Sequence, residues 1–234
     1  MTNKLKYLPA NDKGRDFVVG DIHGCFDEVQ YVLSKGVNFD PSVDRLISVG
    51  NLIDRGPASA LCVDLLYEPW FWNGGQWGKD HTKQELTVVA EKMDELPLVI
   101  VVGSGENRYN VVHANLMKFA NDLTVYYGAN PPVPVTDEMI DYWQFGRDEE
   151  YALIWGRYVI PHQKKYHDPD RMSLTFVGHA LGRVVVQAGQ QMYLDTGDVY
   201  HHTNSNKSEQ YYLSFTCPQE RIMKIVPLAD VNAV

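Results

Sequence analysis

Asp21 and His23 have the residue types and the spacing of a metal-binding pair. They directly follow the β-forming residues 17–19, and glycines flank them at positions 20 and 24. A carboxylate and an imidazole that leave one strand end together suit a borderline divalent cation such as Mn²⁺, Fe²⁺ or Zn²⁺. From this pair alone a second interpretation stays open, in which the aspartate caps the following helix and the histidine lies on the surface.

The same arrangement recurs further along the chain. Apolar runs precede Asn51, His113 and His179, and each of these polar residues stands where the run ends. The carboxyl ends of parallel strands meet at one edge of an α/β sheet, where such folds assemble their sites. We therefore expect five candidate metal ligands to converge in one cleft: Asp21, His23, Asn51, His113 and His179.

The elements that must position these residues are predicted from the hydrophobic pattern. Residues 17–66 predict a strand at 17–21, a helix at about 26–35, a strand at 45–50 and a helix at about 57–67. This order indicates parallel strands with helical crossovers. The second half is β-rich, with a hairpin of residues 98–102 and 108–113 and later strands at 174–179, 184–187, 191–194, about 211–216 and about 221–226.

Composition limits the class of protein. The chain has 234 residues, of which 44% are hydrophobic, so we expect one domain over residues 1–234 with a helical and loop insertion at about 115–166. The net charge of −9 disfavours nucleic acid as a partner. No stretch is long and apolar enough to span a bilayer, and the first residues lack the apolar run of a signal peptide, so we expect a cytoplasmic protein. Three widely spaced cysteines, Cys25, Cys62 and Cys217, are expected to be reduced packing residues.

Taken in order, four segments resemble the metallophosphoesterase superfamily: residues 20–24 (GDIHG), 50–56 (GNLIDRG), 112–114 (VHA) and 177–179 (VGH). The match is closest to the PPP-type serine/threonine phosphatases of the bacteriophage lambda phosphatase group. The resemblance implies an α/β fold, a calcineurin-like β-sandwich flanked by helices. If the protein is encoded by a phage, its location would be the cytoplasm of the bacterial host.

The resemblance also implies roles for single residues. Asp21 and His23 would bind a first metal ion, and His113 and His179 a second. Arg55 and Arg157 would hold the phosphate oxygens, a role that suits the guanidinium group. In the family an aspartate at the position of Asp54 orients the histidine that protonates the leaving group.

Two departures from the family pattern matter. Asn51 stands where the family has a metal-bridging aspartate, and the Gly-Asn-His-Glu motif with its strand and loop is absent, so the fold should lack one strand-loop unit. Without that motif Asp54 becomes either a pocket carboxylate or a structural turn residue. Asp21 is then the only carboxylate among the metal-ligand positions carried over, and two close dications repel strongly. We therefore expect at most one ion, Mn²⁺ or else Fe²⁺ or Zn²⁺, weakly held.

Three functional hypotheses remain open. In the first the chain is a pseudophosphatase that binds a phosphorylated protein or a small phosphate ligand. In the second it is a weakly active, metal-dependent phosphoesterase, and in the third an engineered inactive version of an active phosphatase. An aromatic cluster is either a partner surface or local packing over the sheet edge that the missing strand leaves: Trp70, Phe71, Trp72 and Trp77.

Overall fold

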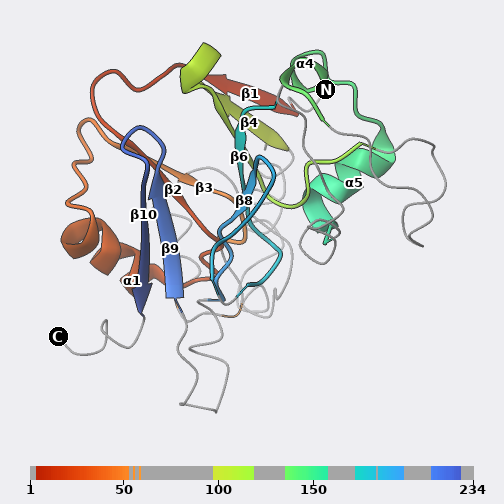
Figure 1. Cartoon of the computed structure of the whole chain (residues 1–234). Coiled ribbons are helices and arrows are strands. Elements are labelled where there is room, and N and C mark those ends of the chain that lie inside the picture. The colour runs from red at the N-terminus through yellow and green to blue at the C-terminus, as the bar shows by residue number, and fades with distance from the viewer. Residues whose placement is uncertain are drawn as a thin grey trace, which may run out of the picture.

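The computed structural model of the chain describes residues 4–52, 55, 58, 97–118, 135–157, 172–182, 184–197 and 212–227. In these residues the strands form two sheets that pack face to face, with helices on the outside (Figure 1). The predictions for the helix at about 57–67, for the aromatic cluster and for Asp54 fall outside the described residues, as does the place of the missing strand-loop unit.

The four-stranded sheet carries the first two site segments. Its strand order is β10 (Ile222–Pro227), β9 (Tyr212–Cys217), β2 (Asp16–Val19) and β3 (Arg45–Ser48). β2 and β3 are parallel, as the sequence predicts, while β9 runs antiparallel to both β2 and β10. The carboxyl ends of β2 and β3 therefore lie side by side.

The six-stranded sheet carries the two later site segments. Its order is β1 (Leu5–Leu8), β4 (Val99–Val102), β5 (Tyr109–Val112), β6 (Leu174–Val177), β8 (Gln191–Tyr193) and β7 (Val186–Ala188). The predicted β4–β5 hairpin is confirmed, with the 3-10 turn η3 (Gly105–Asn107) at its tip. β5, β6 and β8 are mutually parallel. Strand β1, which pairs with β4, was not anticipated from the sequence.

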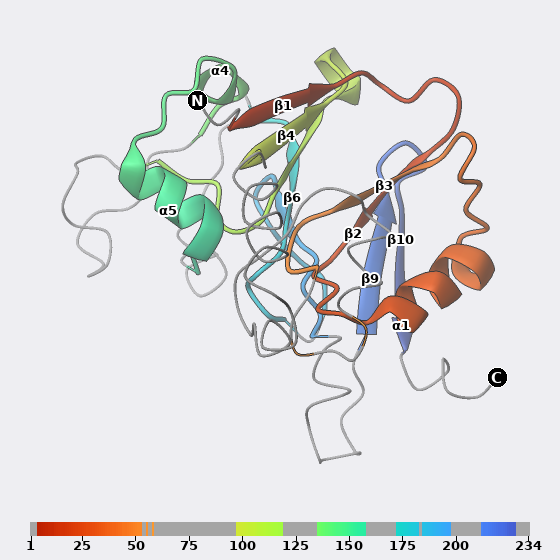
Figure 2. The same cartoon turned by 180° about the vertical axis from the view of Figure 1, so that it is seen from behind.

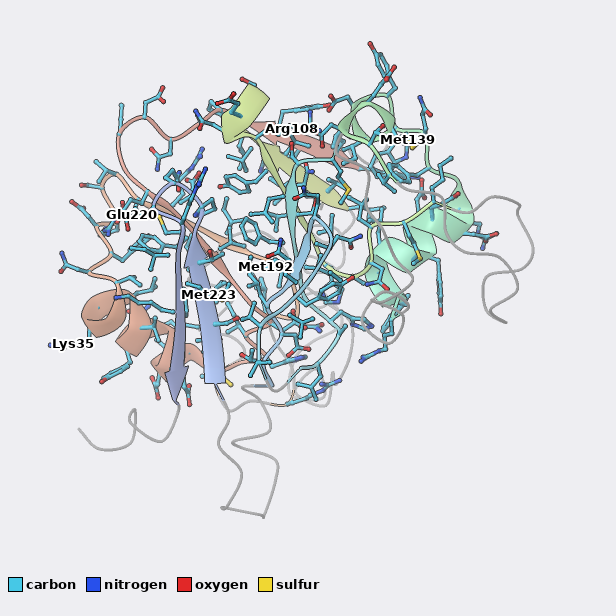
Figure 3. All side chains as sticks on the ribbon, viewed as in Figure 1. Lys35, Arg108, Met139, Met192, Glu220 and Met223 are labelled. Atoms are coloured by element: carbon cyan, nitrogen blue, oxygen red, sulfur yellow. The ribbon has the colours of Figure 1, made fainter. Side chains whose placement is uncertain are left out.

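Apolar side chains fill the space between the sheets. Val18 of β2 and Phe176 of β6 belong to this inter-sheet cluster, and Met192 of β8 packs against it between the two sheets (Figure 3). The outer faces are covered by helices, as Figure 2 shows from behind. Helix α1 (Phe26–Tyr31), continued by the π-helical turn η1 (Val32–Gly36), packs on the four-stranded sheet.

Helices α4 (Asp137–Asp141) and α5 (Arg147–Trp155) pack on the outer face of the six-stranded sheet through Ile140, Ala152 and Leu153. They lie inside the insertion that the sequence placed at about 115–166. The layers, from helix through two sheets to helix, confirm the predicted sandwich flanked by helices.

A buried polar contact joins the two sheets at the amino ends of β2 and β5. Asp16 is fully buried and accepts two hydrogen bonds from the guanidinium of Arg45, at 2.6 and 2.8 Å. The Tyr109 hydroxyl of the other sheet donates to the same carboxylate at 2.7 Å. Because a buried charge is tolerated only when it is paired, this contact fixes how the sheets sit on each other, and so positions their far ends.

In the part of the chain that the structure describes, no helix is long and apolar enough to cross a membrane. Cys25 and Cys217 are buried and are not part of a disulfide, as predicted, while Cys62 lies outside the described residues.

Candidate metal and phosphate site

The loops that follow β2 and β3 are bonded to each other. The backbone N–H groups of Ile22 and His23 both donate to the carbonyl of Asn51, at 3.1 and 2.6 Å, and that of Gly24 donates to Leu52. The side-chain amide of Asn51 then donates to Oδ2 of Asp21 at 2.8 Å, and Nε2 of His23 lies 3.9 Å from the same oxygen. Asp21, His23 and Asn51 therefore form one group.

The ends of β5 and β6 bring two histidines to the same carboxylate. The ring centroids of His113 and His179 are 4.9 Å apart, and the backbone N–H of His179 donates to Oδ2 of Asp21 at 3.0 Å. Gly178 makes this approach possible, because a Cβ at that position would lie 2.0 Å from Oδ1 of Asp21. All five candidate ligands thus lie in one cluster.

The backbone at this cluster adopts a conformation that side chains seldom allow. Among the described non-glycine residues with positive φ are His23 at 49°, Asn51 at 40°, Arg55 at 75° and His179 at 60°. The left-handed region is uncommon for such residues, and its cost persists only where the surrounding structure enforces it. Strain that coincides with four residues selected for their chemistry supports a functional role for the cluster.

Burial controls the charge of Asp21. Desolvation raises the pKa of its carboxyl to about 6, although the hydrogen bonds from Asn51 and from the His179 backbone oppose the shift. Its Oδ1 atom is buried and has no hydrogen-bond partner among the described residues. A buried carboxylate oxygen without a donor is suited to a cation.

The two histidines are held neutral. Desolvation lowers the pKa of His113 to about 4 and that of His179 to about 3, and the neighbouring Arg157 adds to both shifts. Nδ1 of His113 lies 3.3 Å from the carbonyl of Val49, which only accepts, so the proton belongs on Nδ1 and the Nε2 lone pair stays available. The backbone of Trp155 opposes the lowering of the His179 pKa, so it lies close to the His179 ring. Such contacts orient imidazoles for metal binding.

Comparison with known proteins supports the same interpretation. The profile of the calcineurin-like phosphoesterase family matches residues 17–181. The chain belongs to this family. Serine/threonine-protein phosphatase 2 of Escherichia coli (strain K12) is 33% identical over 226 residues, which cover 84% of this chain and 93% of that protein. The Salmonella typhimurium protein of the same name is 29% identical over 77% of this chain and 86% of its own length.

Other known proteins match this chain over shorter segments or in fold alone. A symmetrical bis(5'-nucleosyl)-tetraphosphatase of Actinobacillus pleuropneumoniae is 47% identical over 53 residues, 23% of this chain and 19% of its own. A crystal structure of a protein proposed to be a diadenosine tetraphosphatase superposes with a TM-score of 0.60 over 96% of this chain and 97% of that chain. At 20% identity, this last similarity establishes the fold alone.

Members of the calcineurin-like phosphoesterase family normally use divalent metals, and the donor set of this chain fits such an ion in part. Asp21, His23, His113 and His179 would hold it, and the unpartnered Oδ1 of Asp21 is the atom that most needs it. Within the described ranges, no three His, Cys, Asp or Glu side chains already have the geometry of a preformed site. The side chains must therefore adjust to receive the ion, which when bound would polarise a phosphate oxygen and activate water.

Arg55 and Arg157 are exposed, and both influence the cluster. Their positive charges lower the pKa of Asp21 and of His179, which places both guanidinium groups within electrostatic reach of the site. Asp54, the third residue with a predicted catalytic role, lies outside the described residues.

Asp195 was not predicted as a site residue from the sequence. The residue is 7% exposed and follows β8, which is parallel to β6. Burial and the charge of Asp21 raise the pKa of its carboxyl to about 7. The signal that could have found it is the one used for the other ligands, since the apolar run 192–194 ends at this carboxylate.

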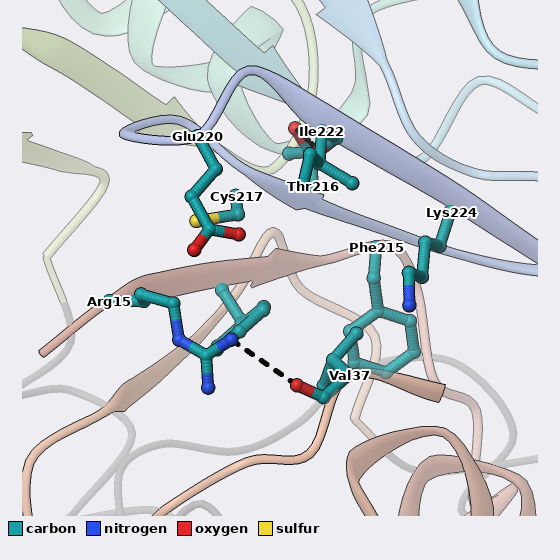
Figure 4. A pocket seen from close by; sticks show the side chains of 9 residues that line it. Arg15, Val37, Phe215, Thr216, Cys217, Glu220, Ile222 and Lys224 are labelled. Carbon is teal, nitrogen blue, oxygen red and sulfur yellow. Dashed lines mark hydrogen bonds between the residues drawn. The ribbon is translucent and has the colours of Figure 1, made fainter. Parts of the chain in front are cut away.

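A separate hollow of about 60 Å³ lies at the opposite end of β2 (Figure 4). In it the Arg15 guanidinium donates to the Val37 carbonyl and is paired with Asp44 at 2.7 Å. Burial raises the pKa of the Cys217 thiol, so this lining residue is a poor nucleophile. The hollow is therefore unrelated to the cluster.

Proposed function

We propose that this chain is a pseudophosphatase of the calcineurin-like phosphoesterase family, in which one weakly held metal ion and two arginines bind a phosphorylated protein or small phosphate ligand. The observation that carries the proposal is the hydrogen bond from the Asn51 amide to Asp21. In the family an aspartate at this position bridges two metals. Here the amide instead occupies one oxygen of Asp21 with an N–H donor.

Electrostatics favour one ion over two. Two dications about 4 Å apart, as in two-metal phosphatases, repel each other by on the order of 15 kcal/mol at an effective dielectric constant of 20. A bridging aspartate offsets part of this repulsion, and the neutral Asn51 does not. A mixed set of imidazoles and a carboxylate suits Mn²⁺, Fe²⁺ or Zn²⁺, of which Mn²⁺ is our first choice.

The phosphate group would be bound by the positive charges of two arginines and a metal ion. Arg55 and Arg157 are exposed, so a phosphate group can reach them from solvent. Guanidinium groups bind phosphate oxygens through two parallel hydrogen bonds, and a metal ion at Asp21 adds a further positive charge on the same ligand. Binding of phosphate should therefore depend on both the ion and the arginines.

Turnover should be low because a proton donor is lacking. The sequence contains no Gly-Asn-His-Glu motif, the family source of the histidine that protonates the leaving group. General acid catalysis contributes about 10²- to 10⁴-fold in rate, which sets the size of the expected loss.

A second candidate is a weakly active phosphoesterase that acts on substrates with good leaving groups. The likeness to serine/threonine-protein phosphatase 2 along nearly the whole chain favours it. If Asn51 and the missing segment were engineered, the binding site would be the same.

A phage origin, a cytoplasmic location and a partner surface at the aromatic cluster stay predictions from the sequence.

Calorimetric titration with inorganic phosphate tests the binding function. The metal-free chain should bind phosphate at least tenfold more weakly than the chain supplied with Mn²⁺, and Arg157→Ala should weaken the metal-dependent binding tenfold or more. Arg147→Ala, at the exposed start of α5, is the matched control and should leave it unchanged. Equal affinity with and without Mn²⁺ would contradict the proposal.

A further inference from the structure

Asp195 stands in the same relation to β8 as His179 does to β6. It stands two positions after the last residue of β8, as His179 stands two positions after the last residue of β6, and β8 is parallel to β6. The backbone N–H of Leu194 donates to Val177 at 2.7 Å, and that of Gly182 donates to the Asp195 carbonyl at 2.9 Å. The segment after β8 is thus fixed against the segment that carries His179.

Asp195 also lies near Asp21, although the two residues follow strands of different sheets. A Cβ on Gly20 would lie 2.3 Å from the carbonyl oxygen of Leu194, so the backbones that precede the two aspartates are in close contact. The charges of Asp21, Arg55 and Arg157 all act on Asp195. Asp195 therefore shares the surroundings of the candidate ligands.

We infer that Asp195 is a second carboxylate of the metal site, which supplies from the end of β8 the negative charge that Asn51 lacks. This inference rests on the proposed metal-binding function. With Asp21, it brings two negative charges to one dication, while the histidines stay neutral. The two carboxylates would together neutralise the charge of one dication, so the site would not need an aspartate at position 51.

A purely structural role for Asp195 predicts something different. Its Oδ1 accepts a hydrogen bond from the backbone N–H of Gly197 at 3.1 Å. In a purely structural role, this hydrogen bond would be the only function of the Asp195 side chain. An asparagine makes the same hydrogen bond without the charge. Two buried carboxylates that repel each other destabilise the metal-free fold, and a cation bound to both would offset that cost. Asp195→Asn therefore separates the two roles.

The experiment is thermal unfolding of the full chain at pH 8, in EDTA and in excess Mn²⁺, together with calorimetric titration of Mn²⁺. Asp195→Asn should unfold at the same or a higher temperature in EDTA, lose most of the stabilisation by Mn²⁺, and bind Mn²⁺ at least tenfold more weakly. Asp16→Asn is the matched control, because Asp16 is buried and ion-paired at the other end of β2. It should lower the unfolding temperature equally in both conditions.

The outcomes separate this inference from the proposed function. If the unchanged chain is stabilised by Mn²⁺ and Asp195→Asn is stabilised as strongly, the inference is wrong and the metal-binding function stands. If Asp195→Asn behaves like Asp16→Asn, the role of Asp195 is structural, which also overturns the inference. If Mn²⁺ neither binds to nor stabilises the unchanged chain, the proposed function fails, and the inference fails with it.

Discussion

The side-chain amide of Asn51 donates a hydrogen bond to the carboxylate of Asp21 over 2.8 Å, joining the segments that follow β2 and β3. A carboxylate at position 51 could not make this bond and would face Asp21 with a like charge. The metal-free fold is therefore adapted to asparagine, whereas binding of two ions would favour aspartate. Stability without metal and affinity for metal oppose each other at this position.

Asn51→Asp should accordingly lower the stability of the metal-free chain by about 2 kcal/mol and tighten Mn²⁺ binding at least tenfold. Thermal unfolding in EDTA and calorimetric titration measure the two effects. Asn38→Asp is the matched control, because Asn38 is exposed, has a similar φ of 49° and lies outside the cluster. Unchanged Mn²⁺ affinity in Asn51→Asp would show that position 51 does not face the ion.

Gly178→Ala tests the close approach of β6 to Asp21. The added Cβ would lie 2.0 Å from Oδ1 of Asp21, so the carboxylate or the strand end must move. We expect a loss of about 2 kcal/mol in stability and loss of the Mn²⁺-induced rise in unfolding temperature. In Gly105→Ala the Cβ meets nothing within 4 Å, so only backbone strain of about 1 kcal/mol applies. Retained Mn²⁺ stabilisation in Gly178→Ala would contradict the described geometry.

The lowered pKa of His113 predicts how its contribution to stability varies with pH. Its pKa is about 4 in the folded chain and about 6.5 in the unfolded chain, so between these values the unfolded chain binds the extra proton. The stability that neutral His113 supports is complete above pH 6.5 and is lost as the pH falls through 4.

Comparison with His113→Gln isolates this contribution from those of Asp21 and Asp195, whose raised pKa values act in the opposite direction. The stability of the chain relative to the variant should fall by about 2 kcal/mol between pH 7 and pH 4 in EDTA. Urea unfolding at each pH measures it. A difference that does not vary with pH would mean that His113 is solvated.

Tyr109→Phe should weaken the contact between the sheets without affecting the metal site. It removes a buried hydrogen bond to the Asp16 carboxylate, at a cost of about 2 kcal/mol. Tyr7→Phe removes an exposed hydrogen bond to Asp141 of 2.9 Å and should cost about 0.5 kcal/mol or less. The Mn²⁺-induced rise in unfolding temperature should be the same in both variants, and a loss of it in Tyr109→Phe would contradict the separation of the two regions.

The sequence predicted the parts of the fold that depend on local pattern. The parallel order of β2 and β3 and the β4–β5 hairpin follow from apolar runs and the segments between them, and the convergence of His113 with His179 follows from their places at strand ends. Strand β1 could not be found in this way, because residues 5–8 carry no alternating pattern and their pairing with β4 joins segments far apart in the chain.

Asp195 was missed for another reason. Its residue type and position satisfied the rule that selected the other candidates, but the family resemblance directed attention to positions with assigned roles. The hydrogen bond of Asn51 to Asp21 was also beyond the sequence, because residue type alone leaves open whether the amide oxygen faces a metal or its nitrogen faces a carboxylate.

The most direct test of the pseudophosphatase proposal is hydrolysis of p-nitrophenyl phosphate across pH, with Mn²⁺ bound per chain counted on the same samples. We predict at most one weakly held ion per chain and negligible turnover. Any residual activity should vanish in His23→Ala and increase in Asn51→Asp. Two tightly held ions per chain, or turnover restored by added metal alone, would contradict both the single-ion site and the assignment as a pseudophosphatase.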